Sequence, residues 1–531
     1  MSHVMNNAMS KQYDVIIIGA GHNGLVCANA LAEKGQRVLV LEANDQVGGM
    51  AITREFAKGY RASAISHLLY GLHPRAQQYA PALYANDDSP LTPVDTIMSN
   101  TQGDWVKLED STRWSKFNDE MKGFSSVLYQ LSDQVPPRLK ETGLNDIKAL
   151  LGAGWQARKL KQEGVRKLLR IIGMNVYDLA DESFDDTLAA NTSSNGASAD
   201  NDLLKSALCF ESIIGTRLGP RAPNTVYNWL NRRAIIDQLP SGVCSVSGGM
   251  GAVSEALAQH AVAQGVEIRT HSAVIKILVE DNRATGVQLE GGEEILADLL
   301  ISNADIKTTM LGLVGPQIVE TQVVRKVNHI PMQGSTAKIH IALNELPSSF
   351  TGDQADLNAR IICADTHDGI ERASNGIKYG EFAEQLPFEV SIASIDDPSL
   401  APEGKHVMSV LIPYVPYENR IGWATQKTKF KNQMMNQLEA LLPGTKAAAS
   451  KVEVLLPSDI EAQCNVTGGH WHHGEIGLER FMMLRPTSGF GQYETSVNNL
   501  YLCGADCHPG GDVNGAAGLN AARAILRRTQ S

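Results

Sequence analysis

The feature that most constrains the fold of this chain is a glycine-rich turn between a short apolar run and an expected helix. The run Val15–Ile18 is apolar throughout, which is typical of a strand buried on both faces. It leads directly into Gly19-Ala-Gly-His-Asn-Gly24, and a helix is predicted from Leu25 to about Lys34. A second strand is predicted over residues 37–41, and Glu42 follows it. This order of strand, glycine turn, helix, strand and acid predicts a dinucleotide-binding βαβ unit.

Each glycine of this turn has its own physical function in such a unit. Gly19 permits the tight turn, Gly21 lets the backbone approach a pyrophosphate, and Gly24 lets the helix pack closely on the strand. The pyrophosphate then lies at the positive end of the helix, beside Asn23, which we include among the candidate cofactor-binding residues. Glu42 is placed to accept a hydrogen bond from a ribose 2′-hydroxyl. The alternative is a glycine turn that has no nucleotide to bind. The order and spacing of the two strands, the helix and the acid disfavour this alternative.

Two further glycine-rich segments favour FAD over NAD as the cofactor. Gly48 and Gly49 stand where a second backbone segment would approach the nucleotide. Far along the chain, a predicted strand ends at Gly504 and Asp506, and a glycine-rich turn then opens a predicted helix over residues 516–527. The acid suits a ribityl chain, and the positive helix end would stabilise negative charge on a reduced flavin. A nicotinamide dinucleotide would need neither group.

The pattern of predicted elements divides the chain into two α/β domains. Three separated segments, residues 1–75, 240–311 and 496–531, are expected to form one Rossmann-type FAD-binding domain. The intervening blocks, 76–239 and 312–495, are expected to form an inserted α+β substrate-binding domain. The first block is mostly helical in pattern. The second contains strand-like runs over 337–343, 389–393 and 406–412 and an amphipathic helix over 425–442.

A third glycine cluster, Gly248-Gly-Met-Gly251, does not predict a second nucleotide site. Its glycines do not follow a buried strand in the G-x-G-x-x-G form. A predicted helix over 252–264 and a predicted strand over 265–269 come next, so this segment is expected to complete the sheet of the FAD domain. No bound pyridine nucleotide is therefore predicted.

Composition and charge narrow the expected partners and location. The 47 basic and 58 acidic side chains give a net charge of −11, which disfavours a nucleic-acid partner. No apolar run reaches the roughly 18 residues of a membrane span, and residues 1–11 lack the apolar core of a secretory signal. Seven scattered cysteines suit a reducing compartment, so a cytoplasmic location is expected. The basic stretch 150–172 predicts a solvated helix face, with peripheral membrane contact as the alternative.

These motifs together resemble those of the flavin-dependent amine oxidase and phytoene desaturase superfamily, which has a glutathione-reductase-like FAD fold. The resemblance is nearest to phytoene dehydrogenase-like FAD-dependent oxidoreductases, in the branch that contains pyridine nucleotide-disulfide oxidoreductase domain-containing protein 2. No cysteine pair follows the first predicted helix, so the disulfide in the name of that branch has no basis here. The matching stretches span nearly the whole chain and are residues 14–51, 248–256, 397–404, 469–475 and 500–522.

The resemblance implies functions for particular residues and a class of substrate. It implies that Glu42 holds the adenosine ribose and that the backbone of Val274 meets the adenine. Asp506 matches an acid that binds the ribityl chain, and Val513 and Asn514 match a turn whose N–H groups face the flavin pyrimidine. The substrate implied by the resemblance is a small hydrophobic molecule, isoprenoid- or polyene-like.

The segment Gly469-His-Trp-His-His-Gly-Glu475 contains the candidate catalytic side chains. His470 and His472 could act as a base or position a substrate, because a histidine titrates near neutral pH. The alternative is that these histidines bind backbone groups and fix the loop. No metal site is predicted, since in an extended segment Glu475 would lie on the face opposite the two histidines.

The expected reaction is the transfer of a hydride from a substrate carbon to N5 of the flavin. Oxygen or a quinone is the expected oxidant, because no second dinucleotide motif is found. Two alternatives remain open: a carotenoid-type ketolase or isomerase that uses reduced flavin, and a flavin-bound regulatory protein without turnover. The sequence leaves the individual substrate and the oligomeric state open.

Overall fold

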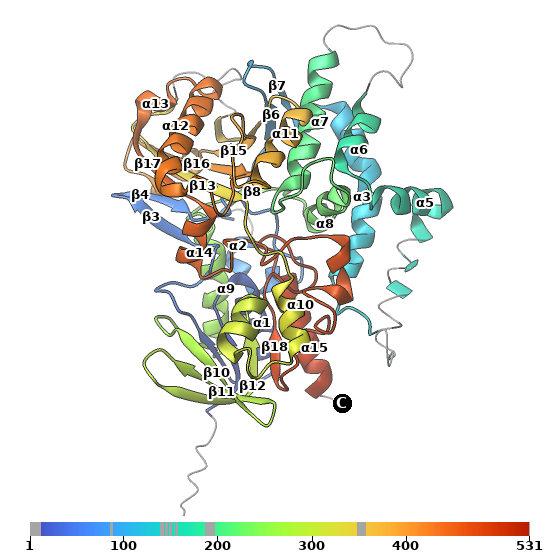
Figure 1. Ribbon diagram of the computed structural model, residues 1–531, viewed down its shortest axis with the longest axis vertical. Helices are drawn as coiled ribbons and strands as arrows, with labels where there is room; N and C mark the ends of the chain where they lie inside the picture. The colour runs from blue at the N-terminus through green and yellow to red at the C-terminus, as the bar shows by residue number, and fades with distance from the viewer. Residues whose placement is uncertain are drawn as a thin grey trace, which may run out of the picture.

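The computed structural model describes residues 12–84, 89–138, 158–185, 197–347 and 357–529, together with 143, 147, 151–152 and 154–155. Within these residues the chain builds two seven-stranded sheets, one in the lower and one in the upper half of Figure 1. Residues 1–11 and part of the predicted basic helix lie outside the described residues. No helix in the described ranges has the length and apolar character that crossing a membrane requires.

The first sheet joins three segments that are far apart in the sequence. Five of its strands run parallel, in the order β9, β2, β1, β12 and β18. Strands β10 and β11 extend β12 as an antiparallel ribbon. The strands are β1 (Tyr13–Ile18), β2 (Val38–Leu41), β9 (Glu267–Arg269), β10 (Val274–Glu280), β11 (Arg283–Leu289), β12 (Glu294–Ser302) and β18 (Leu500–Leu502).

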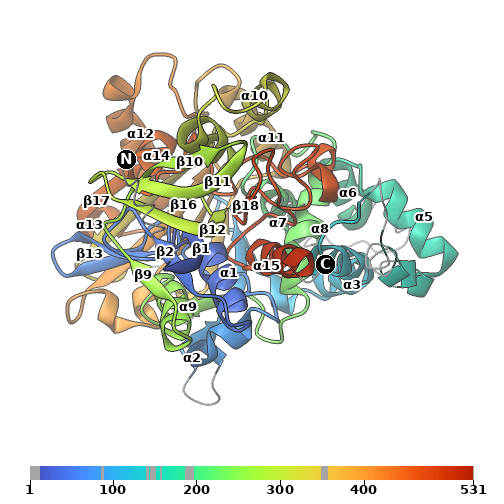
Figure 2. The ribbon, with the colours of Figure 1, turned by 90° about the horizontal axis from the view of Figure 1, so that it is seen from below.

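Helix α1 (His22–Ala32) packs between α9 (Gly251–Ala263) and α15 (Ala516–Thr529), and the three lie together beside β1 in Figure 2. All four residues of β2 are buried, and β1 is buried at five of its six positions, as the apolar runs predicted. The predicted strand–helix–strand order is confirmed. Helix α1 begins three residues earlier than predicted, because Gly21 is already its N-cap.

The second sheet has the order β17-β13-β16-β15-β14-β6-β7. The three strand-like runs of the second block form β13, β15 and β16, and the amphipathic run forms α12 (Trp423–Leu441), so these predictions are confirmed. The strands are β6 (Thr96–Ser99), β7 (Trp105–Lys107), β13 (Thr336–Leu343), β14 (Arg360–Cys363), β15 (Phe388–Ser391), β16 (His406–Pro413) and β17 (Ala449–Leu455).

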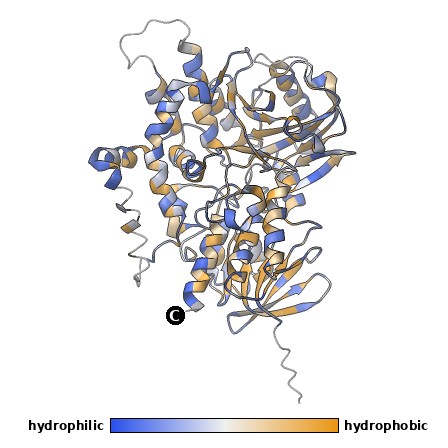
Figure 3. Ribbon diagram, turned by 180° about the vertical axis from the view of Figure 1, so that it is seen from behind, coloured by the Kyte–Doolittle hydropathy of each residue, from blue (hydrophilic) through white to orange (hydrophobic). Residues whose placement is uncertain are grey.

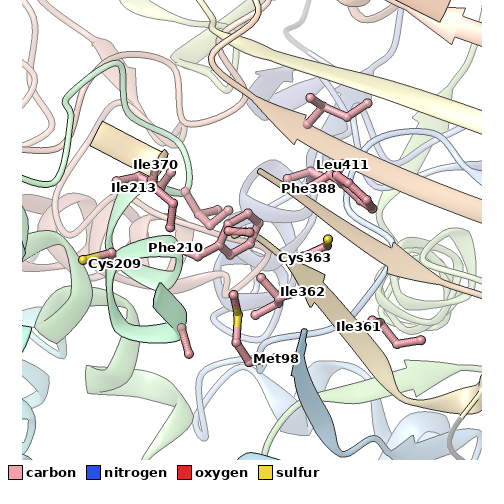
Figure 4. Packing of buried hydrophobic residues seen from close by; sticks show 14 of the residues in the cluster. Met98, Cys209, Phe210, Ile213, Ile361, Ile362, Cys363, Ile370, Phe388 and Leu411 are labelled. Atoms are coloured by element: carbon pink, nitrogen blue, oxygen red, sulfur yellow. The ribbon is translucent and has the colours of Figure 1, made fainter. Parts of the chain in front are cut away.

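Helices from the first block, residues 76–239, pack on this sheet, and the helices and strands together form a hydrophobic core. Figure 4 shows Phe210 and Ile213 at the end of one helix against Ile362 and Phe388 of the sheet. In Figure 3 the helices beside this sheet carry both hydrophobic and hydrophilic colours. The helices around this sheet are α3 (Thr112–Ser132), α6 (Val176–Phe184), α7 (Ala197–Ile213), α8 (Thr225–Ile236), α11 (His367–Ile377), α13 (Thr445–Ala448) and α14 (Pro457–Cys464).

Small elements connect the two sheets. The hairpin of β3 (Thr53–Ala57) and β4 (Tyr60–Ser63) packs Tyr60 and Ala62 against Ala342 and Val407 of the second sheet. We therefore propose the two-domain division predicted from the sequence, with this hairpin as a bridge. The other short elements are α2 (Pro81–Tyr84), β5 (Leu91–Pro93), β8 (Cys244–Val246) and α10 (Thr321–Asn328).

Candidate active site

The glycine turn between β1 and α1 brings backbone atoms closer together than side chains would allow. Gly19 has φ of +93°, and a Cβ on Gly24 would lie 2.4 Å from the carbonyl oxygen of Gly19. A Cβ on Gly21 would lie 2.6 Å from Nδ2 of Asn303, which directly follows β12. Glycine is therefore required here for the turn, the helix and the neighbouring strand end to meet.

Glu42 lies at the carboxyl end of β2 and is held by backbone groups. Its Oε2 accepts a hydrogen bond from the N–H of Ala20 at 2.8 Å, and its Oε1 accepts one from Asn44 at 3.0 Å. The side chain is 6% exposed and lines a pocket. Each carboxylate oxygen keeps a further lone pair, so the acid can still accept a hydrogen bond from a ribose hydroxyl.

This pocket joins the first sheet to residues of the second sheet. Its volume is about 390 Å³, within the usual range of small-molecule sites. Eight predicted cofactor residues line it, and they are Gly19, Gly21, Asn23, Glu42, Gly48, Gly49, Val274 and Val513. The lining also includes Ile65, Ser66, His67, Tyr70, Ile214, Glu389, Leu411, Trp471 and His472, which the sequence did not assign to the cofactor. Segments that are hundreds of residues apart thus share one groove.

Asp506 lies behind the pocket wall and does not line it. Its Oδ2 accepts a hydrogen bond from the N–H of Ile306 at 2.6 Å, and the side chain is 1% exposed. Burial, together with the nearby charge of Asp305, raises the pKa of Asp506 to about 7. Ala505 lines the pocket instead. Gly504 does not line the pocket either. A Cβ on Gly504 would lie 2.8 Å from Oδ1 of Asp506.

Two other predicted cofactor residues support the wall from behind. Asn514 caps α15, since its Oδ1 accepts a hydrogen bond from the N–H of Ala516 at 2.9 Å. Its Nδ2 donates to the carbonyl oxygen of Gly510 at 3.2 Å. Gly24 lies in the contact between α1 and the turn described above. Both residues shape the site through packing and capping.

The residues of the pocket fit a flavin dinucleotide. Among the described residues, Nε2 of His22 and Nδ1 of His473 are buried without a hydrogen-bond partner, and both side chains line the pocket. Burial lowers the pKa of His22 to about 4, so this histidine is neutral at pH 7. Unpartnered polar atoms beside a helix N-terminus are typical of a site that binds a polar cofactor.

The two predicted catalytic histidines have different surroundings. Nδ1 of His470 accepts hydrogen bonds from the N–H groups of His472 and Gly474, both at 3.3 Å, and His470 does not line the pocket. This geometry favours the loop-fixing alternative for His470. His472 lines the pocket, stacks on Trp471 with ring centroids 5.6 Å apart, and places Nε2 3.1 Å from Oδ1 of Asp512.

Arg485 and Glu475 hold the histidine loop in place. The guanidinium of Arg485 is buried and donates to the carbonyl oxygens of His472 at 3.2 Å and Ala505 at 2.9 Å. Glu475 accepts from Oγ1 of Thr216 at 2.6 Å, away from the two histidines. No group of three or more metal-ligating side chains occurs in the part of the chain that the structure describes.

A charged cluster, which the sequence did not predict, reaches the pocket through His67, Glu389 and Asp512. We define it as Lys338, His67, Glu389, Arg360, Glu211, Arg232 and Asp512. Nζ of Lys338 lies 2.6 Å from Nδ1 of His67, and Nε2 of His67 lies 2.7 Å from Oε1 of Glu389. Nε of Arg360 donates to Oε2 of Glu389 at 2.7 Å, and the same guanidinium pairs with Glu211.

The cluster continues around the pocket to the histidine loop. Nη1 of Arg232 lies 3.0 Å from Oε2 of Glu211, and its Nε lies 3.1 Å from Oδ2 of Asp512. Burial raises the pKa of Asp512, but Arg232 and then His472 outweigh burial and hold it below its usual value. The guanidinium of Arg232 also lies 4.6 Å from the ring centroid of Tyr70. Polar contacts therefore connect His67 to His472 through the cluster.

Sequence comparisons place this chain among flavoproteins. A family model described as flavin containing amine oxidoreductase matches residues 24–526. A protein of Rattus norvegicus, named pyridine nucleotide-disulfide oxidoreductase domain-containing protein 2, is 29% identical over 562 residues, which cover 98% of this chain and 94% of the rat protein. The phytoene desaturase (neurosporene-forming) of Rhodobacter capsulatus is 24% identical over 521 residues, 95% of this chain and 91% of that enzyme.

Solved structures show the same fold. An oxidoreductase from Methanosarcina mazei gives a TM-score of 0.58 at 17% identity, over 97% of this chain and 99% of that one. Cyclohexylamine oxidase from Brevibacterium oxydans gives a TM-score of 0.55 at 15% identity, over 98% and 100% of the two chains. At these identities the likeness shows the fold alone, and it confirms the predicted α/β class with a Rossmann-type sheet.

Proposed function

The chain belongs to the flavin containing amine oxidoreductase family, and from this premise we propose that it transfers a hydride from a hydrophobic substrate to N5 of bound FAD. Membership of this family makes it an FAD-dependent oxidoreductase. In our proposal the substrate is isoprenoid- or polyene-like, and oxygen or a quinone reoxidises the flavin. The observation that carries the proposal is that one pocket runs from Glu42 to the turn 511–513 and on to the second domain.

The shape of the pocket suggests how its residues would hold FAD. Glu42 would accept from the adenosine ribose, and Gly19 and Gly21 would lie against the pyrophosphate at the start of α1. The isoalloxazine ring would then occupy the far end, between Gly49 and Val513. Bound there, FAD supplies the hydride acceptor, and the protein supplies orientation and electrostatics.

Apolar side chains in the wall of the pocket support a hydrophobic substrate. Ile65, Ile214, Leu411, Val466 and Trp471 all line the pocket. The name of the Rhodobacter capsulatus relative, a phytoene desaturase, points to the same class of substrate. Burial of such a substrate against these side chains would contribute roughly 25 cal/mol per Å² of apolar surface.

His472 is our candidate for the group that accepts a substrate proton. Asp512 is ionised beside Arg232, so Nε2 of His472 carries the hydrogen that it donates to Asp512. Nδ1 then has a lone pair, and no described residue is its hydrogen-bond partner. A histidine that a carboxylate orients in this way is a typical general base. In a desaturation, one carbon would lose a hydride and its neighbour a proton to His472.

Anaerobic reduction of the flavin tests the proposal. Purified protein, loaded with FAD, is mixed with isoprenoid and polyene substrates in detergent micelles, and the visible flavin absorption is followed. Bleaching by one of these substrates is expected, and it should be much slower in His472→Ala with the absorption spectrum intact. His329→Ala, at an exposed histidine, is the matched control and should bleach at the wild-type rate.

Other results of this experiment would replace parts of the proposal. Failure to bind FAD would refute the cofactor assignment, and bleaching by NADH alone would refute oxygen or a quinone as the sole redox partner. An equal rate in His472→Ala would refute the proposed base. Conversion of a substrate without net bleaching would indicate a ketolase or isomerase that uses reduced flavin.

We also propose peripheral contact with a membrane surface through α5 (Lys161–Ile171), which projects from the body in Figure 1. Trp155 and Leu169 are 64% and 72% exposed, an unusual exposure for large apolar side chains. Exposed cations accompany them, at Arg158, Lys159, Lys161 and Arg166. An apolar patch with cations around it is typical of a surface that binds anionic lipid.

Sedimentation with lipid vesicles tests this contact. The protein should sediment with vesicles that contain phosphatidylglycerol and much less with pure phosphatidylcholine. Leu169→Ser should lower the bound fraction, whereas Tyr379→Ser, at an exposed aromatic residue elsewhere, should leave it unchanged. Equal binding of both variants would show that α5 is not the contact surface.

A further inference from the structure

A second pocket lies where β14 ends and β15 begins. Its lining comes from residues 363–365 at the end of β14, 369–373 of α11 and 383–387 before β15, together with Thr101 and Gln437. Its volume is about 390 Å³, within the usual range of small-molecule sites. The linings of this pocket and of the flavin pocket have no residue in common. The second pocket is therefore a separate candidate site.

Gln437 of α12 contributes an unpaired hydrogen-bond acceptor to this second pocket. The residue is 7% exposed, and its Nε2 donates to Oε1 of Gln385 at 2.7 Å and to the carbonyl oxygen of Leu386 at 3.3 Å. Because a carbonyl oxygen can only accept, the nitrogen must face Leu386, which fixes the orientation of the amide. Oε1 of Gln437 is then buried without a hydrogen-bond partner among the described residues. A buried acceptor of this kind requires a donor from a bound molecule.

Asp365 adds a carboxylate to the lining of the same pocket. Its Oδ1 accepts hydrogen bonds from the N–H of Thr101 at 3.0 Å and from the hydroxyl of Thr101 at 2.6 Å. Its Oδ2 accepts no hydrogen bond from any residue in the described ranges, so this oxygen is available to a ligand. Burial, and then the charge of Asp365, raises the pKa of the Cys363 thiol, so Cys363 is a neutral part of the lining.

The charges around the second pocket favour a cation over an anion. Asp365 and Glu384 line the pocket, and the guanidinium of Arg372, which also lines it, pairs with Asp368 at 2.7 Å. The positive end of α11 is matched as well, because Thr366 caps the helix and Asp368 lies in its first turn. An anionic ligand would meet these carboxylates and would leave Oε1 of Gln437 without a donor.

We propose that the second pocket binds a small organic ammonium ion, such as a protonated primary alkylamine. An ammonium group has three donors and no acceptor, so its N–H groups match Oε1 of Gln437 and Oδ2 of Asp365. Hydrogen bonds from a charged donor are stronger than neutral ones, which favours the ammonium over an alcohol of the same shape. The alkyl chain would lie against the apolar part of the lining, which includes Ile370, Ala373, Leu386 and Pro387. The site goes beyond the proposed function and depends on neither the flavin nor its substrate.

Calorimetric titration of the FAD-loaded protein with n-hexylammonium, n-hexanol and hexanoate tests the proposal. The three probes have similar alkyl chains and differ in the charge and hydrogen-bonding of the head group. One equivalent of n-hexylammonium should bind, at least about tenfold more tightly than either other probe. Gln437→Met and Asp365→Asn should each weaken the binding of n-hexylammonium by about tenfold or more, because each removes an acceptor or its charge.

Gln433→Met is the matched control for Gln437→Met. Gln433 lies one turn earlier on α12, and its Nε2 donates to the carbonyl oxygen of Ala383 at 2.8 Å. This variant therefore removes a similar contact to the segment 383–387 but keeps Oε1 of Gln437, so it should bind n-hexylammonium as wild type does. If Gln437→Met does not fold, Asp365→Asn decides the outcome, because it keeps the oxygen that binds Thr101.

His472→Ala distinguishes the second pocket from the flavin pocket. This variant should bind n-hexylammonium with wild-type affinity. Weaker binding in His472→Ala, with Gln437→Met unaffected, would place the amine beside the flavin and overturn the proposal. Equal binding of n-hexanol, an equal loss of affinity in Gln433→Met, or the absence of saturable binding would also overturn it. Each of these results would leave the proposed flavin chemistry standing, because that depends on FAD binding and on bleaching.

Discussion

Replacing Arg360 with methionine is expected to destabilise the protein by about 3–5 kcal/mol at neutral pH. The guanidinium is 2% exposed and bridges Glu389 and Glu211, with Nε 2.7 Å from Oε2 of Glu389. Methionine fills a similar volume but leaves the buried carboxylate of Glu389 and the partly buried one of Glu211 without that cation. Unfolding entropy of roughly 2.1 cal/mol/K per residue amounts to about 1.1 kcal/mol/K for the 531 residues, so Tm should fall by about 3–5 °C.

The loss of stability caused by Arg360→Met should become smaller at acid pH. In wild type the folded pKa of Glu389 lies below its unfolded value, because Arg360 and His67 outweigh burial. A carboxyl of this kind contributes stability above its unfolded pKa of about 4.3, and that contribution is lost as the pH falls toward the folded pKa. The variant lacks most of this contribution at neutral pH. The stabilities of wild type and Arg360→Met should therefore converge as the pH drops below the pKa of an ordinary glutamate.

Thermal melts followed by circular dichroism and by flavin fluorescence, at several pH values, measure this difference. The double variant Arg360→Met/Glu389→Gln should regain part of the lost stability, since it removes one of the two carboxylate charges that Arg360→Met leaves without its cation. Arg372→Met, at a side chain that is 71% exposed and paired with Asp368, should change Tm by less than about 1 °C. A deficit that is the same at every pH, or that Glu389→Gln does not relieve, would refute the electrostatic reasoning.

Three further substitutions test the site. Gly24→Ala should weaken FAD binding by more than about tenfold, roughly 1.4 kcal/mol, because its Cβ would lie 2.4 Å from the carbonyl oxygen of Gly19. Unchanged FAD affinity in a fluorescence titration would contradict this expectation. Glu42→Gln keeps the shape but removes the charge, so the same titration should show weaker FAD binding, by about tenfold. Gly215→Ala places a Cβ 2.3 Å from Nδ1 of His472, so anaerobic flavin reduction should slow as in His472→Ala; a wild-type rate would show that the ring position is unimportant.

Much of the cofactor half could be predicted from the sequence, because its requirements are local. The turn after β1 needs glycines at Gly19, Gly21 and Gly24, and an acid at the end of β2 completes a pattern of fixed spacing. The position of Asp506 was harder to predict, because the turn after β18 directs neighbouring residues to opposite sides. Ala505 reaches the pocket and Asp506 contacts Ile306. Spacing alone does not distinguish these two directions.

The charged cluster could not be predicted, because its members meet through tertiary structure alone. Lys338 and His340 alternate with apolar residues along β13, and such alternation normally predicts a solvent-facing side. Both are 1% exposed, since that face of the sheet lies against the segment 64–67. A charged residue in two of the three strand-like runs, Lys338 and Glu389, was a visible signal. However, the register that sets Lys338 near Glu389 cannot be read from one sequence.

The three-segment construction of the first sheet bears on when the protein acquires its cofactor during synthesis. Strand β18 and helix α15, which carry Ala505 and Val513 on their flanks, follow every other described element in chain order. A ribosome therefore delivers the glycine turn hundreds of residues before the wall that faces it. During synthesis the nucleotide site therefore stays incomplete until β18 and α15 have emerged, so we expect the protein to bind its flavin late in folding.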